Sequence, residues 1–312
     1  MQMNLLTIAR RADFGYSLRS HFSDTCARLK SGASYFKTVK GSVNLDKMQR
    51  DFHEFTYVTG LVSLAEALLT DMAIEFLVRF PGHMKDKNIQ LDMLGELGSV
   101  GAAVELLAIK AINDWSYGRF ADFVQQVIAL YDKKASLDHG LLEDVSELKA
   151  TRDLFIHASG KVNKAYLNKA GIKARNRKIG TKLELGAKYI AHVEATVERF
   201  ISKLEKLVPA EFMRMGKVSA FQAMWEATVL AKFVPFEMGW IVENDNMVRP
   251  NDKGLSWGWS SSEKMLLDFF LGIYNENYPS RKYDVMSALR RWPPPTNEGK
   301  IIMSWFDSPF WF

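Results

Sequence analysis

Apolar residues recur at three- and four-residue spacing over a long stretch in the first third of the chain. This spacing places them on one broad face of a helix. The Pro81-Gly82 pair that follows cannot continue a helix. The pattern therefore predicts one long helix over residues 48–80. Its apolar positions include Phe52, Phe55, Val62, Leu69, Ala73, Phe76 and Phe80.

Similar patterns of apolar residues follow further along the chain. Gly95, Gly98 and Gly101 lead into apolar rows that predict two helices between residues 104 and 130. After a predicted turn at Asp138-His139-Gly140, a row from Leu142 to Ile156 indicates another helix. A row from Leu185 to Leu207 indicates the last one before Pro209. Together these helices predict an antiparallel bundle over residues 48–208.

The pattern changes beyond residue 209. Seven of the eight tryptophans lie past residue 220, and short apolar runs flanked by turn residues predict a small hairpin within 234–259. Ser260 and Glu263 match a capping box, and a short helix is expected around Ile301 and Trp305. The predicted fold is mainly α, with a smaller mixed α/β C-terminal region. The expected divisions are a basic N-terminal arm (1–47), the helical domain (48–208) and an aromatic-rich accessory domain (209–312).

Composition narrows the class of protein. With 47% hydrophobic and 25% charged residues, the chain is expected to be globular. A single cysteine, Cys26, excludes an intramolecular disulfide and a multi-cysteine zinc cluster, and it favours a reducing cytoplasm. No apolar run reaches bilayer length, and the sequence carries no phosphate-binding or dinucleotide-binding glycine motif. We expect a cytoplasmic protein with no cofactor, no metal and no membrane partner.

The positive charge is unevenly distributed. Residues 1–50 carry nine Lys or Arg against three Asp, and residues 161–182 carry eight basic residues and no acid. Such a run is either a solvated loop or a surface that binds a polyanion. Its position directly after the candidate site described next favours RNA binding. The predicted RNA-binding residues are Lys161, Lys164, Lys173, Arg175, Arg177 and Lys178.

Arg152, Asp153 and His157 form the candidate catalytic site. The guanidinium of arginine holds phosphate, and imidazole exchanges protons near neutral pH. On a helix, Asp153 and His157 are four residues apart and share a face, so the carboxylate can fix the imidazole tautomer. Arg152 is rotated by about 140° from His157 and needs a long reach or a second copy of the motif to meet the same phosphate.

The surrounding sequence resembles the HEPN superfamily, whose ribonuclease members carry Arg-x4-6-His. The matching block runs Glu147-Leu-Lys-Ala-Thr151-Arg152-Asp153-Leu-Phe-Ile-His157-Ala-Ser-Gly160 and continues into Val162-Asn-x-x-Tyr166-Leu167. A second stretch, from Leu64 to Pro81, is similar to the long early helix of such domains. Asp at position 153 departs from the more common Asn. Its charge is expected to raise the pKa of His157 and partly neutralise Arg152.

The resemblance implies a metal-independent endoribonuclease of bacterial or phage defence or toxin systems. His157 would be the general base or acid, Arg152 would bind the scissile phosphate, and Asp153 would orient the imidazole. It also implies a homodimer in which two motifs meet across a two-fold axis, and a protein partner such as an antitoxin. Glu66 and Asp71 are expected either to line the site or to be solvated. Glu147 is expected either to position Arg152 or to lie on a solvated face.

Two other interpretations remain open. The helical domain is compatible with a catalytically inactive HEPN-like bundle that binds RNA or serves as a structural subunit. Alternatively, the aromatic C-terminal region binds another polypeptide and the helical half only dimerises. The tryptophans are expected either to stack unpaired bases or to form a core or an interface with another protein.

Overall fold

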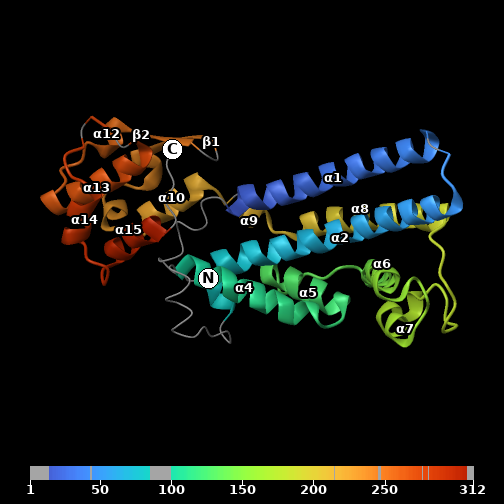
Figure 1. Ribbon diagram of the computed structural model, residues 1–312. Helices are drawn as coiled ribbons and strands as arrows, with labels where there is room; N and C mark the ends of the chain where they lie inside the picture. Colours follow the sequence, from blue (N-terminus) through green and yellow to red (C-terminus); the bar gives the residue numbers. More distant parts are fainter. Residues whose placement is uncertain are drawn as a thin grey trace. The chain divides into compact units, whose positions relative to one another are not determined.

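The computed structural model describes residues 14–42, 44–84, 100–213, 215–244, 247–275, 277–279 and 281–307 (Figure 1). The chain forms two compact units. The larger unit comprises Leu18–Pro209, and the smaller one comprises the described residues up to Ser17 together with those from Ala210 onward. Among the described residues, no helix is both long and apolar enough to cross a membrane.

Helix α2 (Lys47–Arg79) is the central element of the larger unit, and it confirms the long helix predicted over residues 48–80. It begins with a capping box. The Asp46 carboxylate accepts from the Gln49 N–H at 2.8 Å, and the Gln49 side chain accepts from the Asp46 N–H at 3.0 Å. These bonds satisfy two N–H groups at the start of the helix. The helix ends at Phe80, before a single 3-10 turn at Pro81–His83.

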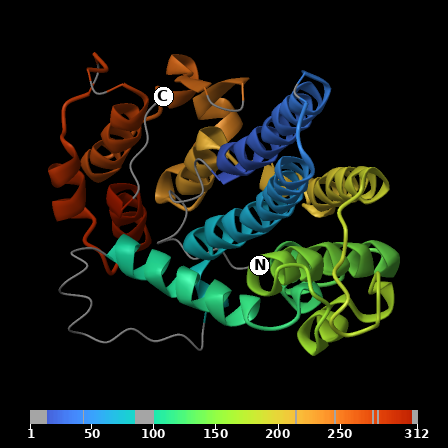
Figure 2. The same cartoon turned by 45° about the vertical axis from the view of Figure 1, so that its right-hand side comes forward.

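Four of the helices that contact α2 lie alongside it, as Figures 1 and 2 show. They bury one face of α2, including Leu68, Leu69 and Phe76. The Tyr131 hydroxyl is buried with them and donates to the Met72 carbonyl at 2.8 Å. The expected helical bundle is therefore present, while Gly95 and Gly98 lie outside the described residues. The four helices are α4 (Val100–Ser116), α5 (Phe120–Tyr131), α6 (His139–Ala158) and α8 (Ala187–Leu207).

Helix α6 carries the candidate motif. The predicted turn at residues 138–140 is instead its beginning, because the Asp138 carboxylate caps the helix by accepting from the Leu141 N–H at 3.0 Å. At the other end, Ser159 and Gly160 adopt left-handed backbone with φ of 50° and 75°. A Cβ at Gly160 would lie only 3.0 Å from the Phe155 ring, so glycine is required for this reversal of the chain.

The basic segment 161–182 is more ordered than the predicted loop. It contains α7 (Lys164–Ala170) and a 3-10 turn at Gly171–Lys173. Its two ends pair in a short antiparallel bridge between Lys161 and Lys182, next to a bond from the Leu183 N–H to the Gly160 carbonyl at 2.9 Å. The bridge returns the chain to the end of α6.

The N-terminal region differs from the predicted basic arm. Residues Phe14–Ser42 form helix α1, and the residues from Leu18 onward belong to the larger unit. Aromatic side chains link α1 to α2, because the Phe36 ring stacks on Tyr57 with centroids 4.1 Å apart. The signal for this helix is present in the sequence, because Leu18, Phe22, Leu29 and Phe36 recur at helical spacing and are buried along one face. The expected division after residue 208 lies one residue from the end of the larger unit.

The described residues of the smaller unit are mainly helical, and their strand content is limited to one two-stranded hairpin, less than the expected mixed α/β region. Strands β1 and β2 are antiparallel, with Trp240 opposite Pro250 and Val242 opposite Val248, which confirms the predicted hairpin. The predicted capping box is also present, with Ser260 and Glu263 bonded reciprocally at the start of α13. The elements are α9 (Ala210–Met213), α10 (Lys217–Glu226), a 3-10 turn (Val229–Lys232), α11 (Phe236–Gly239), β1 (Trp240–Asn244), β2 (Met247–Pro250), α12 (Asp252–Leu255), α13 (Ser261–Tyr274), α14 (Val285–Arg291) and α15 (Asn297–Asp307).

Most tryptophans whose position the structure describes in this unit belong to its core. Trp225 and Trp240 are fully buried, and the Trp225 indole N–H donates to the Val234 carbonyl at 2.9 Å. Trp259 is buried in the same way through a bond to the Leu255 carbonyl. The faces of these three buried rings are covered, so they cannot stack on a nucleic-acid base. Trp257, by contrast, is 55% exposed.

Candidate functional site

The α6 helix places the three predicted catalytic residues near its C-terminal end. Asp153 and His157 lie one turn apart on one face, as expected from their spacing. That face continues toward the start of the helix through Ser146 and Lys149. Arg152 points to a different side, toward α2.

The Arg152 guanidinium is half-buried in a cluster of charges. Its Nη1 lies 3.1 Å from Asp153 Oδ1 and 3.8 Å from Glu66 Oε2, and its Nη2 lies 3.4 Å from Ser63 Oγ. Glu66 therefore lines the site, which was one of the two possibilities that its sequence position left open. Within the described part of the chain, the Nε of Arg152 is buried without a hydrogen-bond partner. One N–H donor of the Arg152 guanidinium is thus left without a hydrogen bond.

Asp153 is held by cations rather than by the imidazole. Its carboxylate accepts from Lys149 Nζ at 2.7 Å and from Lys169 Nζ at 3.1 Å, in addition to Arg152. Burial alone would raise the pKa of Asp153, but these hydrogen bonds outweigh it and the pKa is lowered. The predicted orienting bond to His157 is not among the contacts of the described residues. Three positive groups within reach compete better for the carboxylate than an exposed imidazole does.

His157 is exposed in the last turn of α6. In the described ranges, its side chain has no hydrogen bond or ion pair. The structure thus brings Arg152 and Asp153 together but joins neither of them to His157. Lys149 was not predicted to belong to the site, although its spacing of four residues from Asp153 on a helix is a recognisable ion-pair signal.

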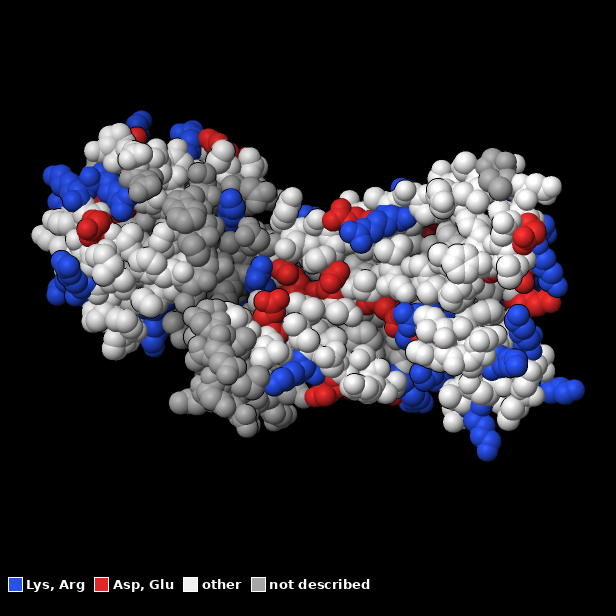
Figure 3. Space-filling model, viewed as in Figure 1, with Lys and Arg blue, Asp and Glu red and all other residues white. Residues whose placement is uncertain are grey.

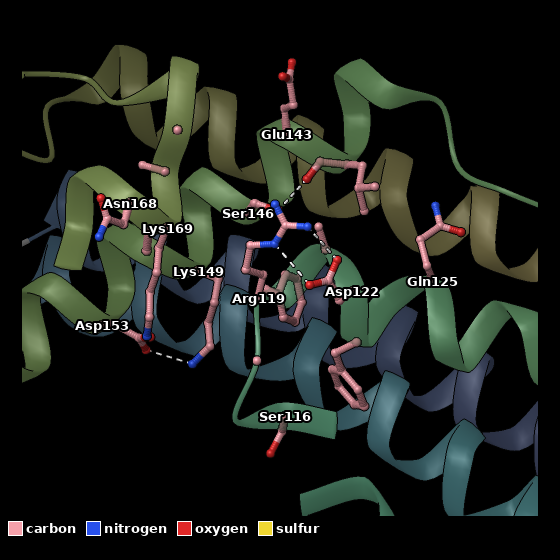
Figure 4. A pocket seen from close by; sticks show the side chains of 18 of the residues that line it. Ser116, Arg119, Asp122, Gln125, Glu143, Ser146, Lys149, Asp153, Asn168 and Lys169 are labelled. Atoms are coloured by element: carbon pink, nitrogen blue, oxygen red, sulfur yellow. Dashed lines mark hydrogen bonds and ion pairs between the residues drawn. The ribbon is translucent and has the colours of Figure 1, made fainter. Parts of the chain in front are cut away.

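A cavity of about 510 Å³ runs along the outward face of α6, between α5 and α7. Figure 4 shows Asp153 with Lys149 and Lys169 at one end and Gln125 at the other. Arg119 projects between them and binds the Asp122 carboxylate through two contacts of 3.0 Å. His157 is one turn beyond Asp153 on the same face, about 6 Å further along the helix axis. Along α6 the cavity is lined as far as Asp153, one turn short of His157.

The predicted RNA-binding residues fall into two groups. Lys161, Lys164 and Lys178 are exposed, and so is Lys182, which the bridge places opposite Lys161. Their side chains have no acidic partner among the described residues. Lysine and arginine side chains gather over α7 and the segment after it (Figure 3). We call Lys161, Lys164, Lys178 and Lys182 the lysine cluster.

The other predicted RNA-binding residues are occupied within the protein. Lys173 binds Asp144 at 2.8 Å, and this bond raises the pKa of Lys173. The exposed Arg177 donates to the Gly171 carbonyl at 3.2 Å. Arg175 stacks on the Tyr189 ring at 3.6 Å and donates from Nη2 to the Glu184 carbonyl. Arg175 therefore has a structural role, and its part in RNA binding stays a prediction.

Glu147 is the buried centre of the polar network that fixes this region. It is 3% exposed, and its carboxylate accepts from Thr151 at 2.5 Å, Tyr189 at 3.0 Å and Tyr166 at 3.3 Å. These bonds join α6 to α7 and α8. Neither expectation for Glu147 holds, because it is not solvated and the structure gives no contact with Arg152. Asp71 has an ion-pair partner on α1, His21, at 3.7 Å.

Within the described ranges, no three His, Cys, Asp or Glu side chains lie together as metal ligands would. Comparisons with models of protein families, with curated proteins and with solved structures found no match. The resemblance to the HEPN superfamily therefore rests on the residues quoted above. The function is argued below from the geometry of this site.

The Glu147 network leads to a prediction on stability. Glu147→Ala leaves two tyrosine hydroxyls without their acceptor and should lower the free energy of unfolding by about 3 kcal/mol. Burial raises the pKa of Glu147 from 4.5, so protonation favours the folded state. This stabilisation is present below the unfolded-state pKa and is lost as the pH rises through the higher folded-state pKa. Glu147→Gln should remove this pH-dependent loss of stability. Urea unfolding between pH 4 and 8 measures it.

A matched control is Glu143→Ala, one turn earlier on α6, where the carboxylate lies 3.5 Å from the exposed His139. That change should alter the free energy of unfolding by less than about 1 kcal/mol. Equal effects of Glu143→Ala and Glu147→Ala would contradict the role of the buried network.

Proposed function

We propose that the larger unit is a HEPN-like endoribonuclease that cleaves RNA without a metal ion. The observation that carries the proposal is the exposed His157 imidazole at the end of α6. It lies directly before a lysine cluster that has no acidic partner among the residues that the structure describes. The cluster supplies phosphate contacts, and the imidazole supplies proton transfer. The Arg152 guanidinium, on the same helix, is partly exposed and adds N–H donors for a phosphate oxygen once it is released from its ion pairs.

In the proposed reaction, the RNA 2′-oxygen attacks the adjacent phosphorus while the bond from phosphorus to the 5′-oxygen breaks. Neutral His157 accepts the proton from the 2′-hydroxyl, or protonated His157 donates a proton to the departing 5′-oxygen. The products are a 2′,3′-cyclic phosphate and a 5′-hydroxyl. Arg152 stabilises the charge on the non-bridging oxygens once its longer contact, to Glu66 at 3.8 Å, is exchanged for phosphate.

The setting proposed for this activity is a cytoplasmic protein of a bacterial or phage defence or toxin system. This part of the proposal rests on the sequence resemblance. In such a system a homodimer would combine two motifs, so that each His157 performs one of the two proton transfers. An antitoxin-like protein would restrain the activity.

A second candidate function is RNA binding without cleavage. It is favoured by the engagement of Asp153 with Lys149 and Lys169, which leaves the imidazole without its orienting carboxylate. In this case the lysine cluster binds RNA in the same way, and His157 takes no part. Cleavage assays separate the two functions.

The first functional prediction concerns cleavage. Purified protein incubated with total RNA in EDTA should produce new ends that carry cyclic phosphate. His157→Ala should reduce the rate at least about 100-fold, because a general acid or base contributes that much. Arg152→Ala should also reduce it, since the phosphate loses its donor.

His192→Ala is the matched control, because His192 is also an exposed histidine on a helix of the larger unit. The His192→Ala variant should cleave RNA at the wild-type rate. Cleavage that stops in EDTA or survives His157→Ala would contradict the mechanism, while binding without any cleavage would support the second function.

The second functional prediction concerns binding. Replacing all four members of the lysine cluster with Ala should weaken binding of single-stranded RNA of any sequence. It should also reduce the slope of log affinity against log salt by about 0.7 for each phosphate that is no longer neutralised. Fluorescence anisotropy at several salt concentrations measures both effects.

The control carries the same change in net charge elsewhere on the unit, with Ala at the exposed Lys133, Lys134, Lys203 and Lys206. Its affinity and salt slope should stay close to those of the wild type. If both quadruple variants bind equally well, the lysine cluster is a solvated surface.

A further inference from the structure

The first turns of α2 expose large apolar side chains. Met48 is 78% exposed and Phe52 is 68% exposed, and the half-buried Phe55 follows three residues later. Their spacing of four and three residues places them on one side of the helix. We call these three residues the apolar stripe. An exposed apolar patch of this kind marks a site that contacts another molecule.

A hollow of about 770 Å³ adjoins the apolar stripe. It is lined by the stripe, by the end of α6 and by residues 182–186. The Phe55 and Phe155 rings stack in its wall with centroids 6.0 Å apart, and the buried Leu183 and Leu185 also line it. Its volume lies within the range that is usual for sites that enclose small molecules. The wall is thus largely apolar and aromatic, which suits the flat face of a ring.

The lysine cluster borders the same hollow. Lys182 belongs to the cluster and lines the hollow. Lys161 is opposite Lys182 in the antiparallel bridge, and opposed residues of such a pair project to the same face. Both exposed ammonium groups therefore lie on the side of the hollow. A phosphate backbone held by these two lysines passes along its rim.

The charges beside the apolar stripe are compatible with a nucleic-acid base. Arg50 and Glu54 lie on another side of these turns, which leaves Lys47 and Asp51 as neighbours of the stripe, one charge of each sign. A base is uncharged and meets no net repulsion there, while its phosphate stays outside with the lysines. The carboxylate of Glu184, on the segment that closes the hollow, can accept from the amino group of a base.

An exposed aromatic ring beside a row of cations is the combination by which proteins bind single-stranded nucleic acids. The bases of a duplex are stacked on one another, so only an unpaired base can offer its face to such a ring. We propose that the hollow receives unpaired bases of an RNA strand. Phe52 is the ring on which a base stacks, and the lysine cluster holds the adjoining phosphates. The inference rests on the RNA binding of the proposed function and adds the form of the RNA and the residue that contacts its bases.

A binding assay with RNA that cannot be cleaved tests the stacking. A 2′-O-methyl oligonucleotide has no 2′-hydroxyl, so its affinity is independent of the proposed reaction. Phe52→Ala should weaken its binding about 10-fold, the order expected for the loss of one stacked base, and Phe52→Trp should restore it. The slope of log affinity against log salt should be the same for Phe52→Ala and the wild type, because stacking releases no counterions.

A fluorescent base reports the contact directly. The emission of 2-aminopurine falls when this base stacks on an aromatic ring. It should fall when a single-stranded oligonucleotide that contains it binds the wild type, and it should fall less with Phe52→Ala. The matched control is Tyr35→Ala on α1, because Tyr35 is 67% exposed, and this variant should bind as the wild type does. A blunt-ended RNA duplex should bind Phe52→Ala and the wild type equally.

The outcomes separate this inference from the proposed function. Wild-type affinity of Phe52→Ala with an unchanged circular dichroism spectrum would overturn the stacking site and leave the apolar stripe to a protein partner. An equal loss of duplex binding, or an unchanged 2-aminopurine signal, would overturn it too. If the wild type binds no RNA, the proposed function fails together with the stacking site. Stacking without cleavage of ordinary RNA would support the site and contradict only the cleavage mechanism.

Discussion

The arrangement around the candidate site depends on one buried carboxylate. Glu147 lies on α6 and accepts hydrogen bonds from its own helix, from Tyr166 on α7 and from Tyr189 on α8. The Tyr166 hydroxyl in turn accepts from the Arg175 N–H at 2.9 Å. A buried acceptor is costly unless it is satisfied, so the three segments must keep their positions together. The path of the basic segment follows from this requirement.

The same rigidity explains why Asp153 has its present partners. Lys169 reaches Asp153 only because α7 is held against α6, where Ala150, Leu154 and Tyr166 share a small apolar core. An incoming phosphate that binds Lys149 and Lys169 would release the carboxylate toward its neighbour one turn away, His157. Catalysis in the proposed form therefore requires a local exchange of ion pairs rather than a rearrangement of helices.

Local signals in the sequence predicted the elements well. The helix over residues 48–80 and the capping box at Ser260 follow from periodicity and from contacts three or four residues apart. The role of Glu147 was not predictable in this way, because its partner Tyr189 lies 42 residues further along the chain. Arg175 illustrates the same limit. Its sequence neighbours are basic and suggest a nucleic-acid surface, but an aromatic ring from α8 occupies its guanidinium.

The bridge between Lys161 and Lys182 places two positive side chains opposite each other on the two segments that it pairs. Like charges in this position destabilise a strand pair, and nothing acidic among the described residues offsets the repulsion. The fold thus holds a small electrostatic cost at its surface that any bound anion would relieve. Anion binding and closure of the segment that joins α6 to α8 are then thermodynamically linked, and each strengthens the other.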